Sequence, residues 1–172
     1  MANPHLNGVR ANTLYSRSAT SLTVPTGVTL TVTDADKLVV GSNPIPQQIE
    51  VTAHVGAAAL MVDQSFFVAT RAYQVTAVSF VHAVAETTAA TLLVQVTKDV
   101  STNAPGAGTD LLTNNTNPGF DGKATANTVQ AGTLTATAAS LLLAAGDRLS
   151  LDFSAGATEL VGVTVTVSLK PV

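Results

Sequence analysis

One stretch near the C-terminus limits the possible folds more than any other part of the chain. Five apolar residues there occupy every second position, namely Val161, Val163, Val165, Val167 and Leu169. Apolar side chains spaced in this way share one face of a β-strand, whereas on a helix they would be spread around the axis. The stretch is therefore expected to be a half-buried strand, with Val163, Val165 and Val167 in the core and Thr164 and Thr166 outside it.

The same period of two recurs along the chain and predicts an all-β fold. Further strands are expected at 28–33, 37–40, 49–55, 66–68, 73–85, 91–98, 128–138 and 149–153. Both parities of 73–85 carry apolar residues, so both faces of that strand are expected to be covered. Alanine favours helix in 57–61 and 136–145, but neither stretch combines caps with a period of 3.6. We therefore expect an antiparallel β-sandwich of about eight strands with a jelly-roll-like layout.

The chain is long enough for one domain with an appendage. Residues 1–25 lack a sustained period and are expected to form an extended N-terminal arm, with the sandwich domain at 26–172. The isolated apolar residues of the arm are expected to contact another subunit or the surface of a neighbouring protein: Leu6, Val9, Leu14 and Tyr15. The alternative for the arm is a frayed end. A long loop is expected at 99–125, where Leu111, Leu112 and Phe120 are candidate anchors and candidate contact residues.

Composition excludes several classes of function. The net charge is −3 and only 11% of residues are charged, so we expect neither nucleic-acid binding nor a polybasic membrane anchor. There is no cysteine for a disulfide or a thiolate metal site. The 26 threonines imply a surface of hydroxyl and small apolar groups, which is best explained if an assembly covers much of it. The alternative is a secreted β-domain with a neutral surface.

The sequence also lacks a constellation typical of catalysis. His5, His54 and His82 have no second ligand at strand spacing, and the glycine-rich segment 105–110 has no lysine for a phosphate. Asp34 and Asp36 flank a turn, where a simple Asx turn competes with weak Ca²⁺ binding. Aromatic platforms for sugars or bases are scarce. We expect no catalytic, cofactor or metal site, and hence no enzyme.

Two parts of the chain resemble a known family of virion proteins. Residues 145–153 followed by 160–169 resemble the closing hairpin of small β-sandwich proteins of tailed bacteriophages, and 75–80 followed by 91–98 resemble their earlier strands. The similarity covers about residues 67–169 and is nearest in kind to capsid decoration (cement) proteins with a jelly-roll fold.

The resemblance implies a structural role outside a phage capsid. Such a protein would be made in the host cytoplasm, form a homotrimer, bind the major capsid protein and stabilise contacts between capsomers. The alternatives are the receptor-binding head of a tail fibre or spike, and a carbohydrate-binding domain or small hydrolase.

Overall fold

The computed structural model describes residues 39–40, 43–44, 48–88, 91–114 and 118–172. The chain divides into two compact units, Met1–Pro44 and Ile45–Val172. In the first unit, β1 (Val39–Val40) pairs with β2 (Asn43–Pro44) in an antiparallel ladder. The predicted arm, the strand predicted at 28–33 and the boundary predicted after residue 25 all lie outside the described residues.

The described residues of the second unit form ten strands in two sheets. The first sheet contains β3 (Ile49–Val55), β5 (Tyr73–Val81), β9 (Gln130–Ala131), β10 (Leu142–Leu143) and β12 (Val163–Pro171). The second sheet contains β4 (Gln64–Val68), β6 (Leu93–Asp99), β7 (Thr109–Asp110), β8 (Phe120–Asp121) and β11 (Arg148–Phe153). Two short 3-10 helices, η2 (Ala58–Leu60) and η3 (Ala138–Leu141), lie between strands.

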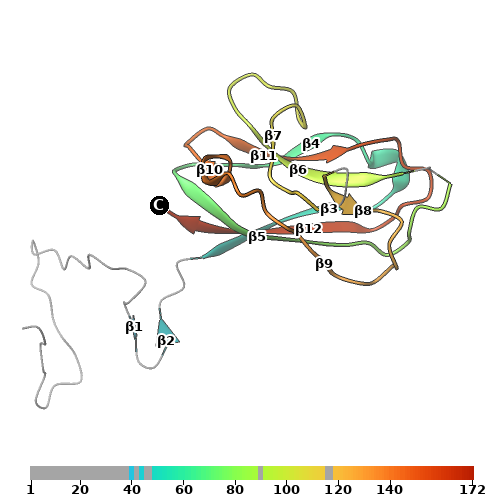
Figure 1. Ribbon diagram of the computed structural model, residues 1–172, viewed down its shortest axis with the longest axis horizontal. Helices are drawn as coiled ribbons and strands as arrows, with labels where there is room; N and C mark the ends of the chain where they lie inside the picture. The colour runs from blue at the N-terminus through green and yellow to red at the C-terminus, as the bar shows by residue number, and fades with distance from the viewer. Residues whose placement is uncertain (1–38, 41–42, 45–47, 89–90, 115–117) are drawn as a thin grey trace, which may run out of the picture. The chain divides into compact units, whose positions relative to one another are not determined.

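The order of the strands is that of a jelly roll. The first sheet runs β10-β5-β12-β3 with β9 also on β5, and the second runs β4-β11-β6-β7 with β8 also on β6. Strands β9 and β10 pair with opposite ends of β5 and so share one place in the first sheet. Strands β7 and β8 share one place beside β6 in the second sheet in the same way. The ten strands therefore occupy eight positions, four in each sheet. From one position to the next the chain changes sheet at every step except that from β6 to β7, which are neighbours in the second sheet (Figure 1). This order confirms the predicted antiparallel sandwich with a jelly-roll layout.

Strand β12 is central in the first sheet and follows its sequence pattern closely. It pairs with β3 on one side and with β5 on the other. Val163, Val165 and Val167 are fully buried, while Thr164 and Thr166 are only partly covered. The predicted register is therefore confirmed, since a slip of one residue would exchange these two sets.

Along strand β5, the residues that face the core switch from odd-numbered to even-numbered positions. Its buried residues are Tyr73, Val75, Val78 and Phe80. The change coincides with a register shift against β12 between Ser168 and Leu169, a bulge that leaves Thr76 without a ladder partner. Thr76 and Ala77 are exposed, so the prediction of two covered faces is wrong here. Two-sided burial occurs instead on β6, where six of seven residues are buried.

The segment predicted as a long loop at 99–125 closes one side of the sandwich. Its strands β7 and β8 pair with β6, and Leu112 forms a bridge with Leu134. Leu111, Leu112 and Phe120 have exposed fractions of 0%, 1% and 0%. These side chains anchor the segment in the core.

The long strand predicted at 128–138 is wrong beyond its first residues. Only Gln130–Ala131 pairs with β5 as a strand. The amide of Gly132 then donates to the carbonyl of Val78 at 2.8 Å, after which the chain crosses to the bridge at Leu134. The threonines in this stretch therefore line a crossover and not a sheet.

The two segments compared with a closing hairpin do not pair with each other. Strand β11 pairs with β4 and β6, whereas β12 pairs with β3 and β5 in the other sheet. The connection between them spans the two layers, as it must at the end of a jelly roll.

Candidate functional site

Four loops meet at one end of the sandwich, which we call the loop end (Figure 1, right). They are residues 56–63, 82–92, 122–129 and 154–162, and each carries the chain from one sheet to the other. Backbone hydrogen bonds join each loop to at least one of the others. The loop end is therefore a connected platform and not four independent segments.

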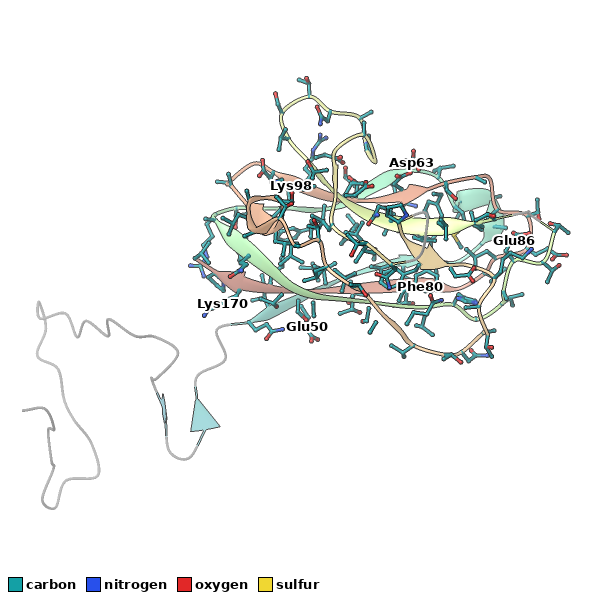
Figure 2. All side chains as sticks on the ribbon, in the orientation of Figure 1. Glu50, Asp63, Phe80, Glu86, Lys98 and Lys170 are labelled. Carbon is teal, nitrogen blue, oxygen red and sulfur yellow. The ribbon has the colours of Figure 1, made fainter. Side chains whose placement is uncertain are left out.

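The carboxylate of Glu86 fixes two of these loops to each other (Figure 2). Only 1% of the residue is exposed. One oxygen accepts the amides of Glu159 and Thr158 at 3.0 and 2.8 Å, and the other accepts the amide of Thr88 at 3.0 Å. The hydroxyls of Thr88 and Thr158 also donate to it, at 2.7 and 2.8 Å. Led by the amide of Glu159, these hydrogen bonds hold the pKa of Glu86 far below its usual value of 4.5, despite the opposing effect of burial.

A buried histidine ties the third loop to the second. His82 is 1% exposed, and its Nε2 lies 3.0 Å from the carbonyl oxygen of Ala124. The amide of Asn127 donates to the carbonyl of His82 at 2.8 Å, and the amide of Glu86 donates to that of Gly122 at 3.0 Å. Nδ1 of His82 is buried without a hydrogen-bond partner. A hydrogen on Nε2, donated to the carbonyl oxygen of Ala124, fits these contacts.

The remaining loop is held by backbone contacts that require glycine. The amide of Gly162 donates to the carbonyl of Gly56 at 3.1 Å, which joins 154–162 to 56–63. Gly162 has φ +69°, and a Cβ atom there would lie 2.8 Å from Cβ of Ala83. Asp63 accepts the amide of Phe153 at 2.9 Å. Any side chain at position 162 would therefore separate two of the loops.

The surface of the loop end is poor in charge and exposes apolar side chains. Its four loops contain only four charged residues, namely Asp63, Glu86, Lys123 and Glu159. They also carry four exposed large apolar residues, which are Leu60 (60% exposed), Val62 (60%), Val84 (48%) and Val129 (67%). Charge depletion with exposed apolar groups, on loops held by a rigid scaffold, is typical of protein-binding surfaces.

A separate acidic cluster lies under the 100–108 loop. Asp99 is fully buried and accepts hydrogen bonds from the hydroxyls of Thr97 and Ser150 and from the amide of Gly106. Burial, followed by the negative charges of Asp63, Asp110 and Asp99, raises the pKa of Asp152. Burial also raises that of Asp110. The hydrogen bond from the amide of Gly106 to Asp99 thus attaches the 100–108 loop to β6.

No group of three or more histidine or acidic side chains suited to a metal ion occurs among the described residues. His54 lies on β3, with its Nδ1 3.0 Å from the hydroxyl of Thr164, and His82 lies in the loop end. His5, Asp34 and Asp36 fall outside the described part of the chain.

The predicted contact residues fall into two groups. Leu6, Val9, Leu14 and Tyr15 lie outside the described residues. Leu111, Leu112 and Phe120 are core residues, so their side chains are not presented to a partner by the folded sandwich.

Sequence reasoning missed the loop end and its central residue Glu86. Apart from Thr88, the partners of this carboxylate named here lie 72 to 74 positions away, so no local motif reveals the site. A single acidic residue flanked by alanine and threonine, in a segment otherwise free of charge, is the only signal that the sequence offers.

Within the described residues, no helix has both the length and the apolar character needed to cross a membrane. Comparisons of the chain with known protein families, with curated proteins and with solved structures find no match.

Proposed function

We propose that the chain is a structural protein of a phage virion, which binds the outside of the capsid and stabilises contacts between capsomers. The observation that supports this most strongly is the loop end, a charge-poor platform that displays Leu60, Val62, Val84 and Val129. The jelly-roll order of the strands agrees with the family that the sequence resembles. The proposed partners are the major capsid protein and further copies of this chain, as a homotrimer.

The cross-linked loops suit a binding surface because they are already ordered. Ordering a flexible loop on binding costs free energy that its contacts must offset. Glu86 and His82 fix three of the four loops before any partner arrives. A bound copy then favours the assembled shell over free capsomers by mass action, and a trimer that contacts several capsomers adds avidity.

Two leucine variants test the loop end directly. Leu60 at the loop end is 60% exposed, and Leu142 on β10 is 44% exposed. Leu60→Glu places a charge in the proposed contact and is expected to weaken co-sedimentation with capsids by about tenfold or more. Leu142→Glu is the matched control and is expected to bind like the wild type. Equal binding by both variants would refute a loop-end contact.

The N-terminal arm offers a second test. Deleting residues 2–25 is expected to leave the thermal melting of the sandwich nearly unchanged while weakening attachment to capsids or to other copies, because the arm lacks a core pattern. Unchanged attachment would mean that the arm is a frayed end, and loss of folding would mean that it belongs to the sandwich. Binding to host cells with no binding to capsids would favour a tail-fibre or spike head.

A further inference from the structure

Strand β3 lies at one edge of the first sheet. It is the last strand of the first sheet and pairs with β12 on one side, and no described residue pairs with its other side. Glu50, Thr52 and His54 are exposed along the strand. A free edge presents backbone amides and carbonyls that can pair with another strand.

The other edges of the sandwich differ from β3. The far side is closed where Leu112 bridges Leu134. Strand β4 ends the second sheet, but it has five residues, and its pairing with β11 is shifted between Leu149 and Ser150. The seven residues of β3 pair with β12 without any shift. Strand β3 is therefore the longest regular edge of the sandwich.

Strand β3 also lacks the features that usually prevent edge pairing. Proteins guard free edges with lysine, proline or bulges. The strand reads Ile-Glu-Val-Thr-Ala-His-Val and contains none of these, and Glu50 is its only acidic or basic residue apart from His54. Its sequence therefore permits a further strand to be added.

The hydrogen-bond phase shows which backbone groups face outward. The amide of Gly132 donates to the carbonyl of Val78, so on β5 Val78 bonds to β9 and Ser79 forms a hydrogen-bonded pair with Thr166 of β12. In an antiparallel ladder such pairs alternate along the strand. The even residues of β12 therefore bond to β5 and its odd residues bond to β3, so the residues at even positions of β3 direct their amides and carbonyls to the open edge: Glu50, Thr52 and His54.

We propose that a second copy of this chain pairs with that edge, β3 against β3, around a two-fold axis at Thr52. This register pairs all seven residues and places each outward-facing even residue opposite another even residue. Glu50 of each copy then lies opposite His54 of the other copy, so this pair occurs twice. Since Nδ1 of His54 lies 3.0 Å from the hydroxyl of Thr164, Nε2 is its other hydrogen-bonding atom and can donate to the carboxylate.

The side chains on the two faces also match in this register. On the outer face, the hydroxyl of Thr52 lies 3.3 Å from that of Thr166, and the axis extends this threonine row into the second copy. On the core side, Val51 meets Ala53 and Ile49 meets Val55 of the second copy. Ile49, which is 38% exposed, would be covered. Such a contact is isologous and joins only two copies, so it is separate from the three-fold contacts of the proposed homotrimer and does not depend on the proposed function.

Cysteine cross-linking of the full chain tests the register, because the chain has no cysteine of its own. Two residues at a hydrogen-bonded antiparallel pair have Cα atoms about 5.5 Å apart, which is within reach of a disulfide. Thr52→Cys is therefore expected to give a covalent dimer under mild oxidation. Glu50→Cys and His54→Cys are each expected to remain monomeric on a non-reducing gel, since identical residues lie roughly 13 Å apart along the strands. Mixing those two variants is expected to give the dimer.

A second variant removes the backbone pairing itself. Thr52→Pro deletes one outward amide in each copy and spares the ladder with β12. It is expected to raise the dissociation constant of the dimer by about tenfold or more in sedimentation equilibrium. A wild-type monomer whose edge amides exchange rapidly with solvent would overturn the proposal. Protected edge amides in a monomer would also overturn it, since another segment, such as 28–33, would then occupy the edge. A trimer that Thr52→Cys does not cross-link would overturn the edge pairing and leave the proposed function standing.

Discussion

Replacing Phe120 by alanine separates its role as a core anchor from a role in binding. Its side chain is fully buried, and its ring stacks on that of Phe80 with 5.1 Å between centroids and 12° between planes. Removing a buried phenylalanine side chain costs about 3–5 kcal/mol, part of which is the loss of the aromatic pair. For a domain of this size the loss corresponds to a fall in melting temperature of roughly 10 °C.

Thermal unfolding followed by circular dichroism measures this effect. Val129→Ala is the control because Val129 is 67% exposed, and a truncation there is expected to change stability by less than about 0.5 kcal/mol. If Phe120→Ala melts like the wild type but binds its partner less well, the residue is a contact and the core assignment is refuted.

Three further predictions concern Val165, Glu86 and Asp152. Val165→Asp is expected to unfold the sandwich by burying an unpaired charge, whereas Thr164→Asp is expected to be tolerated; circular dichroism showing the reverse would refute the register of β12. Because the pKa of Glu86 is lowered by folding, its stabilisation is present at neutral pH and is lost as the pH falls below about 4.5; the difference in melting temperature between wild type and Glu86→Gln should shrink in that range. Folding raises the pKa of Asp152, so its charge opposes folding at neutral pH; Asp152→Asn should raise the melting temperature at pH 7 and gain nothing once the carboxyl is protonated.

The regular strands could be predicted because their alternation is local. The alternation in β12 predicted both the strand and its register, because Val163, Val165 and Val167 all lie on one face of the strand and that face is buried. The bulge in β5 could not be predicted. It depends on the pairing of Ser168 and Leu169, which are distant in the sequence, and it reverses the parity that faces the core.

The crossover after β9 was missed for a related reason. Threonine and small residues at 132–137 resemble a strand, but the position of Gly132 against Val78 and Leu112 decides that the chain leaves the sheet. The loop end could not be predicted for the same reason. Glu86 joins two loops only because the fold places residues 158–160 beside its carboxylate. Local sequence patterns thus predict the regular strands, whereas contacts between distant residues determine the crossover after β9 and the arrangement of the loop end.

The most direct test of the proposed function is a cryo-EM reconstruction of the particle with which this chain co-purifies. We predict density for the jelly roll on the outer surface of the shell where capsomers meet, with residues 56–63, 82–92, 122–129 and 154–162 turned toward the capsid. Density at the tip of a tail fibre, or a shell without this chain, would contradict the account.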